Sequence, residues 1–150
     1  MDDDDLRRGK LTVHKKYGES TAVLAGNSLL TMAFEIISEK TFLISDIKKN
    51  QLVYILAASS GHSGIAGGQF QDLSFERKKI GKSKILEMQL NKTGKLFMFS
   101  ALAPVILSNK KNMFKKFSNL GLEIGLLFQI IDDLLDFNGN AKKLGKKIHK

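Results

Sequence analysis

Length, composition and charge limit the kinds of protein that this chain can encode. Its 150 residues are enough for one domain, and 43% of them are hydrophobic, which is enough for a folded core. The chain has no cysteine, so a disulfide framework, a thiolate zinc site and a cysteine nucleophile are excluded. We expect no apolar run long enough to span a membrane and no signal segment, and therefore a soluble, cytoplasmic protein without stable membrane insertion.

The positive charge is large, with 24 Lys and Arg against 15 Asp and Glu and a net charge of +9. Such an excess suits nucleic acid, an anionic membrane surface or a small polyanion such as a diphosphate. The lysines are scattered along the chain, and neither a zinc-finger spacing nor an aromatic RNA-binding motif is present, which argues against nucleic acid. Two of the three arginines, Arg7 and Arg8, are adjacent and closely follow four consecutive aspartates. Composition alone does not explain that placement.

The first half of the chain predicts two helical segments. One begins at Ser20 or Thr21 and ends at about Ile37, because its apolar residues recur on one helical face. The next begins with Asp46 as its N-cap and continues through the glycine cluster at 61–68. A glycine cluster is typical of a loop, but this spacing of three residues also suits a helix in close contact with a neighbour, which we favour.

The second half predicts two more helices. The third runs from about Ser83 to Leu107, with Pro104 bending or ending it, and the fourth runs from Ser118 to Phe137 before a tail rich in glycine and lysine. The sequence shows no alternation with turn signals of the kind that predicts β-hairpins. We therefore expect an all-α fold, with residues 1–150 forming a single domain.

The fourth predicted helix carries a narrow polar seam. Advancing about 100° per residue from Gln129 places Asp132, Asp133 and Asp136 within one arc. The rest of the helix there is apolar: Phe128, Ile130, Ile131, Leu134, Leu135 and Phe137. A helix that is apolar on nearly all sides is usually buried, so we expect the seam to face an internal cavity.

Carboxylates gathered in such a cavity repel one another unless a cation joins them. Oxygen ligands without His or Cys select Mg²⁺ or Ca²⁺, and Mg²⁺ usually completes its shell with water and substrate phosphates. The alternative is a solvated acidic edge neutralised by nearby lysines. The apolar flanks favour the metal site.

A second acidic cluster, Asp2 to Asp5, precedes Arg7 and Arg8. Such a run is often a disordered tail, and it also resembles a protease-cleavage tag, but that tag ends in Lys whereas Leu6 follows here. The remaining interpretation is an acidic patch and two arginines that hold a metal and its bound anion. Arginine donates forked hydrogen bonds to phosphate oxygens, which suits this role.

Taken in order, these motifs resemble the trans-polyprenyl diphosphate synthases, and most closely the bacterial short-chain farnesyl and geranylgeranyl diphosphate synthases. The matching segments cover nearly the whole chain: 1–9, 17–19, 24–26, 67–69 with Asp72, 92–94, 128–129 and 132–136. The resemblance implies part of an all-α isoprenoid-synthase bundle around a central cavity. It also implies Mg²⁺, which joins two Asp-rich motifs to an allylic diphosphate. Isopentenyl diphosphate then attacks the allylic cation head to tail, and a proton is lost.

The resemblance assigns roles residue by residue. The metal ligands are Asp2, at the end of the first Asp-rich motif, and Asp132, Asp133 and Asp136 of the second. The diphosphate contacts are Arg7, Arg8, Lys92 and Lys146. The catalytic residues are Lys92, Thr93 and Gln129: Lys92 and Thr93 lie near the allylic diphosphate and cation, and Thr93 and Gln129 stabilise the cation. Two further positions, Gln69 and Asp72, line the cavity or serve packing.

The chain departs from the family pattern at both ends. The leading aspartate pair of the first motif is absent, as are the upstream Lys, Arg and His that hold isopentenyl diphosphate, and the chain stops soon after Lys146. We therefore expect an internal fragment of a synthase, from a family that commonly forms homodimers, or a truncated gene or late assigned start. The alternatives are a catalytically silent remnant or partner subunit, and a class I terpene cyclase, whose second metal motif the seam does not match.

Overall fold

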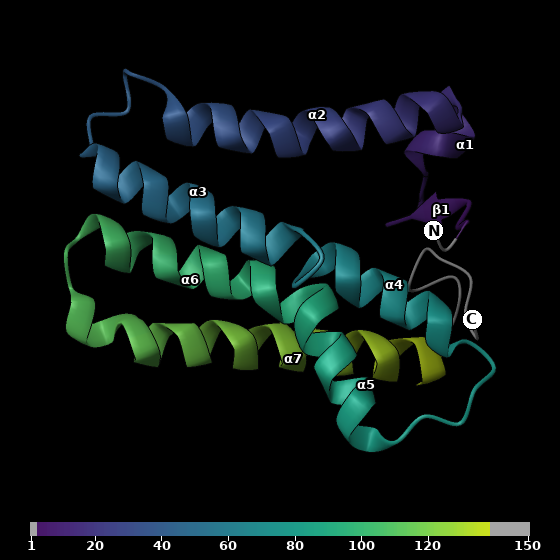
Figure 1. Ribbon diagram of the computed structural model, residues 1–150. Helices are drawn as coiled ribbons and strands as arrows, with labels where there is room; N and C mark the ends of the chain where they lie inside the picture. The colour runs from purple at the N-terminus through teal and green to yellow at the C-terminus, as the bar shows by residue number, and fades with distance from the viewer. Residues whose placement is uncertain (1–2, 139–150) are drawn as a thin grey trace. The chain divides into compact units, whose positions relative to one another are not determined.

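The computed structural model describes residues 3–138 (Figure 1). Its helices and strands, in chain order, are β1 (Leu6–Arg7), β2 (Lys10–Leu11), α1 (Val13–Tyr17), α2 (Glu19–Ser38), α3 (Asp46–Ser60), α4 (Ile65–Phe75), α5 (Lys82–Gln89), the π-helical turn η1 (Leu90–Gly94), α6 (Lys95–Leu107), the 3₁₀ turn η2 (Lys111–Met113) and α7 (Phe114–Asn138). The all-α fold class is confirmed. The Gly- and Lys-rich tail lies outside the described residues.

The chain divides into two compact units. The first comprises residues 1–35 and 130–150, and the second comprises residues 36–129. The second unit contains α3 to α6 and most of α7. Each unit is described by itself below, and the single 1–150 domain stays a prediction.

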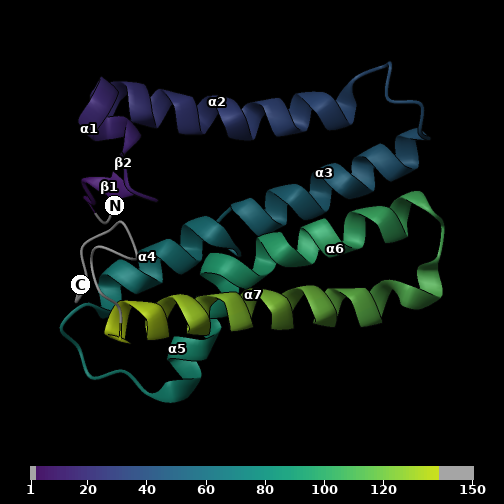
Figure 2. The same cartoon turned by 180° about the vertical axis from the view of Figure 1, so that it is seen from behind.

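The core of the second unit lies between α3 and α6. Leu52 and Ile55 of α3 pack with Leu102 and Ile106 of α6, and Leu52 and Leu102 are only 2% and 1% exposed. The two helices lie side by side in both views (Figures 1 and 2). Their burial anchors the segments that carry the candidate site, because α4 follows α3 and η1 leads directly into α6.

The glycine cluster interrupts the second predicted helix, so the expectation of one continuous helix is wrong. Helix α3 ends at Ser60 and α4 begins at Ile65. The break occurs because Gly61 and Gly64 leave the helical backbone region. A Cβ on Gly64 would lie 2.0 Å from the carbonyl oxygen of Ser59, so only glycine fits this turn. At the start of α3 the N-cap is Ser45, and Asp46 is the first helical residue.

The third predicted helix is confirmed as a helical segment, with an irregularity that the sequence did not predict. Residues 82–107 form α5, η1 and α6 in succession, and α6 continues past Pro104 to Leu107. The π-helical turn interrupts the regular helix, and α5 turns away from the line of α6 (Figures 1 and 2).

A short β-hairpin forms near the N-terminus, contrary to the prediction of no hairpin. Leu6 pairs with Leu11 and Arg7 pairs with Lys10 in antiparallel register. The connecting residues Arg8 and Gly9 have φ values of 52° and 74°. Two positive φ angles are what a two-residue type I′ turn requires. Arg-Gly is a weaker signal for this turn than Asn-Gly, which is why the pattern was missed.

Helix α2 matches its predicted span but is more apolar than expected. Its 20 residues include none that is buried, and an 18-residue window has a mean hydropathy of 1.4. Within residues 3–138 it is the one helix long and apolar enough to cross a membrane by length and composition. The expectation of no segment long and apolar enough to span a membrane is therefore wrong by this criterion. The apolar residues of α2 are interrupted by small and hydroxyl residues, so no continuous apolar run is visible although the mean hydropathy is high.

Candidate functional site

Lys92 and Thr93 lie in the π-helical turn η1, between two regular helices. A π-helical turn alters the helical register, and such turns occur frequently at functional sites. Here the two adjacent side chains reach two different helices. Lys92 contacts α4, and Thr93 contacts α7.

The ammonium of Lys92 is held by a carboxylate of α4. Its Nζ atom lies 2.5 Å from Oδ2 of Asp72. The side chains are 25% and 34% exposed, so the ion pair is shielded from solvent without being sealed from it. Asn91 of η1 adds a weak contact by donating from Nδ2 to Oε1 of Gln71 over 3.5 Å. The predicted cavity-lining residue Asp72 is thus a direct partner of a predicted diphosphate contact.

A glycine brings α4 and η1 together. A Cβ on Gly68 would lie 2.2 Å from the backbone nitrogen of Lys92 and 2.6 Å from its Cα. The two backbones therefore meet with no side chain between them. Gly68 and Asp72 are four residues apart and share one face of α4, so this close approach places the Asp72 carboxylate beside the Lys92 side chain.

A second close approach fixes η1 against α7. The Thr93 hydroxyl donates a hydrogen bond to Oε1 of Gln129 over 2.9 Å. A Cβ on Gly125 would lie 2.5 Å from the Cα of Gly94, so glycine is required where these two segments cross. Two predicted cation-stabilising residues are therefore in direct contact.

Replacing Thr93 with Val is expected to destabilise the chain by about 1 kcal/mol, because it removes the hydroxyl donor while keeping the side-chain volume. Chemical unfolding in urea measures this change in the free energy of unfolding. Thr93→Ser, which keeps the donor, is the matched control and should lose less stability than Val. A Val variant at least as stable as the Ser variant would show that the hydrogen bond to Gln129 is not formed.

Gln69 contributes a buried donor close to the same region of α4. Its Nε2 atom is inaccessible to solvent and has no hydrogen-bond partner within the described part of the chain. Buried donors are rarely left without a partner in folded proteins. A donor of this kind suits contact with a ligand oxygen or an ordered water.

The acidic seam lies on α7 as predicted, but the expected burial of its surroundings is wrong. Ile131 and Leu134 are 47% and 54% exposed, Asp132 is half-buried, and Asp133 is exposed. An apolar helix is buried only where other elements of the folded chain cover it. In the described part of the chain, the apolar residues that flank Asp132 and Asp133 are exposed where the prediction has them buried.

The seam's donor chemistry nevertheless suits magnesium. Asp132, Asp133 and Asp136 supply only carboxylate oxygens, at positions i, i+1 and i+4 of α7. Hard oxygen ligands of this kind are preferred by Mg²⁺. Among the described residues, no three His, Asp or Glu side chains converge into a group that could hold a metal ion. The metal assignment therefore stays a prediction.

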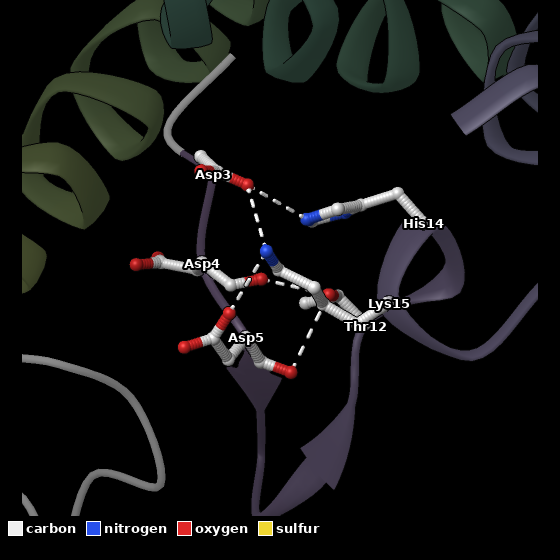
Figure 3. A network of polar contacts seen from close by, with 6 residues as sticks. All are labelled: Asp3, Asp4, Asp5, Thr12, His14 and Lys15. Atoms are coloured by element: carbon white, nitrogen blue, oxygen red, sulfur yellow. Dashed lines mark hydrogen bonds and ion pairs between the residues drawn. The ribbon is translucent and has the colours of Figure 1, made fainter. Parts of the chain in front are cut away.

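The acidic run near the N-terminus is engaged by basic residues (Figure 3). Nζ of Lys15 lies 3.3 Å from Oδ1 of Asp3 and 3.2 Å from Oδ1 of Asp5. His14 Nε2 lies 3.2 Å from Oδ1 of Asp3, although not in hydrogen-bond geometry. The hydrogen bond and charge of Lys15 lower the pKa of Asp3, and the carboxylates of Asp5 and Asp3 raise the pKa of Lys15.

The predicted site residues fall into two groups, one in each unit. The second unit brings together Asp72, Lys92, Thr93 and Gln129. The first unit contains Arg7, Arg8, Asp132, Asp133 and Asp136. Asp2 and Lys146 lie outside the described residues. Sequence reasoning missed Lys15, although a hairpin between the aspartates and α1 is the signal that would have indicated it.

Comparison with known proteins identifies the family of the chain. The family model described as polyprenyl synthetase matches residues 1–150. Farnesyl diphosphate synthase of Bacillus subtilis (strain 168) is 40% identical over 150 residues, which are 99% of this chain and 51% of that protein. Geranylgeranyl pyrophosphate synthase 4 of Arabidopsis thaliana is 41% identical over 154 residues, which cover 100% of this chain and 41% of that protein.

A solved structure gives the same result. The geranyltransferase of Helicobacter pylori, in complex with magnesium and isoprenyl diphosphate, matches with a TM-score of 0.88 and 34% identity, covering 99% of this chain and 49% of that one. The helical fold of the chain is thus similar to that of this solved structure. The chain belongs to the polyprenyl synthetase family. It spans about half the length of the curated relatives it matches.

Proposed function

We propose that this chain supplies part of the active site of a prenyltransferase that condenses isopentenyl diphosphate with an allylic diphosphate to give farnesyl or geranylgeranyl diphosphate. The observation that carries the proposal is the grouping of four predicted site residues from three helical segments. Asp72 holds Lys92, and Thr93 donates to Gln129. These side chains come together through glycine contacts that leave no room for substitution.

Each of these groups has a chemical task in such a reaction. Lys92 offers a fixed positive charge to the departing diphosphate, where negative charge develops as the allylic bond breaks. The oxygens of Thr93 and Gln129 offer partial negative charge to the allylic cation. Arg7 and Arg8, on the hairpin, are suited to forked hydrogen bonds with substrate diphosphates.

Magnesium would be held by the aspartates of the seam on α7 and by Asp2. When bound, it supplies Lewis-acid stabilisation of the charge on the diphosphate leaving group. The positively charged side chains of Arg7, Arg8 and Lys92 then orient that diphosphate. We place the reaction in the cytoplasm and the complete enzyme in a homodimer, as the family resemblance implies.

The test is an assay of product formation. The 150-residue chain, and a version extended by the coding sequence upstream of Met1, are incubated with isopentenyl diphosphate, an allylic diphosphate and Mg²⁺. The extended version is expected to yield a longer prenyl diphosphate. The proposal fails if the extended version forms no such product and binds neither substrate.

A second candidate function is a non-catalytic partner of a complete synthase. Exposed apolar side chains favour it, since α2 has no buried residue and several flanks of α7 are uncovered. Turnover by the 150-residue chain alone would exclude this alternative. Product formed only when a full-length synthase is added, and in excess of what that synthase makes by itself, would support it.

A further inference from the structure

The arginines of the hairpin lie very close in sequence to carboxylates that compete for them. Asp5 is two residues before Arg7, and Asp3 and Asp4 precede it. A guanidinium binds a carboxylate with the same forked geometry that it uses for phosphate. An unrestrained acidic run would therefore pair with Arg7 and Arg8 and reduce their affinity for an external diphosphate.

Lys15 engages these competing carboxylates. Figure 3 shows contacts from the Lys15 ammonium to both Asp3 and Asp5. Nζ of Lys15 lies 3.3 Å from Oδ1 of Asp3 and 3.2 Å from Oδ1 of Asp5. The backbone of the same run is held by Thr12, whose hydroxyl donates to the carbonyl of Asp4 over 2.7 Å and whose amide donates to the carbonyl of Asp5 over 3.0 Å. The acidic run is thus fixed against the start of α1.

The two arginines lie on the hairpin itself. Arg8 lies in the type I′ turn and Arg7 lies on β1, and both side chains are exposed. Within residues 3–138, no ion pair involves Arg7 or Arg8. The carboxylates of Asp3 and Asp5 are paired with Lys15, while both arginines are exposed.

Stability does not account for this arrangement. The side chains of Lys15, Asp3 and Asp5 are 38%, 77% and 40% exposed. Solvent-exposed ion pairs contribute little to the free energy of unfolding. The ion pairs of Lys15 instead determine whether Arg7 and Arg8 bind these carboxylates or an external diphosphate.

We propose that Lys15 is a positioning residue for diphosphate binding: it holds Asp3 and Asp5 away from Arg7 and Arg8 and so keeps both guanidinium groups available to diphosphate oxygens. This inference rests on the proposed function, which assigns the two arginines to the substrates.

The experiment measures the affinity of the 150-residue chain for inorganic pyrophosphate by calorimetry, in buffer without divalent cations. Lys15→Met is expected to weaken binding about tenfold, because the released carboxylates capture the arginines. Lys16→Met is the matched control, since Lys16 is adjacent, loses the same charge and forms no ion pair among the described residues. It is expected to weaken binding only about twofold, through long-range charge alone.

A mutant cycle separates competition from general electrostatics. The double variant Asp3→Asn with Asp5→Asn is expected to change the affinity for pyrophosphate by about twofold in the wild-type chain. In the Lys15→Met background, the same double variant is expected to raise this affinity about tenfold and so to restore it. If Lys15 acts only through its positive charge, the Asp→Asn double variant changes the affinity for pyrophosphate equally in both backgrounds. That result would overturn the inference. Equal affinities of Lys15→Met and Lys16→Met would overturn it too.

Failure of the proposed function has a different signature. If the wild-type chain does not bind pyrophosphate, its arginines do not form a diphosphate site and the role proposed for Lys15 fails, while the proposed function is still decided by the product assay of the extended version. If it binds through the arginines, as loss of binding in Arg7→Gln would show, the cycle decides the role of Lys15 alone. Amide hydrogen exchange at Thr12 checks that the hairpin is still folded in each variant.

Discussion

Replacing Gly68 with Ala is expected to destabilise the chain by about 3 kcal/mol, near the upper end of the usual cost of overpacking. The new Cβ would lie 2.2 Å from the backbone nitrogen of Lys92. A backbone atom cannot rotate aside as a side chain does, so α4 has to move away from η1. The Lys92–Asp72 ion pair would be lost with that contact. Urea unfolding gives the change in the free energy of unfolding.

The same substitution at Gly26 is the matched control. Gly26 lies in α2, and a Cβ built there meets no atom within 4 Å. Alanine is the better helix former, so Gly26→Ala is expected to stabilise the chain by about 0.5–1 kcal/mol. The two variants thus have opposite expected signs. A Gly68→Ala variant as stable as the wild type would contradict the close approach of α4 and η1.

The double variant Asp132→Asn with Asp136→Asn is expected to abolish the effect of Mg²⁺ on pyrophosphate binding. In the wild-type chain, Mg²⁺ is expected to tighten this binding at least tenfold (roughly 1.4 kcal/mol), because the metal joins the seam carboxylates to the anion. Asparagine keeps the shape of each side chain but removes its charge. The measurement is calorimetric titration of pyrophosphate with and without Mg²⁺.

Glu123→Gln provides the control for the change of charge on the same helix. Glu123 is an exposed residue of α7 and lies outside the seam. Its variant is expected to keep the full effect of Mg²⁺. A double seam variant that also keeps this effect would show that the metal is held elsewhere, and the solvated acidic edge would then be the correct interpretation of the seam.

Local sequence patterns predicted the helices well where contacts with other helices do not change the backbone conformation. Helix α2 was expected from Ser20 or Thr21 to Ile37 and is observed from Glu19 to Ser38. The fourth predicted helix began at Ser118, and α7 begins at Phe114. Apolar periodicity is a property of neighbouring residues in the chain, so it is readable without the fold.

The same patterns failed where tertiary contacts decide the backbone. The π-helical turn η1 occurs where α4 and α7 approach it through Gly68 and Gly125. The break between α3 and α4 is a local turn in which Gly64 packs against the backbone at the end of α3. The glycine spacing did predict a close approach, but not which partner each glycine would meet. The hairpin was missed because its Arg-Gly turn is a weak signal and because two-residue strands carry too little alternation to be recognised.

Sequence alone determined the all-α class, the acidic seam and, through the family resemblance, the candidate site residues. Only the tertiary structure decided that Lys92 contacts Asp72, that Thr93 contacts Gln129 and that Lys15 pairs with Asp3 and Asp5. The physical reason is that helix formation depends on interactions within a few residues. Contacts between side chains of different helices depend on the distance between their backbones. Here that distance is short where a glycine has no side chain to separate the two segments.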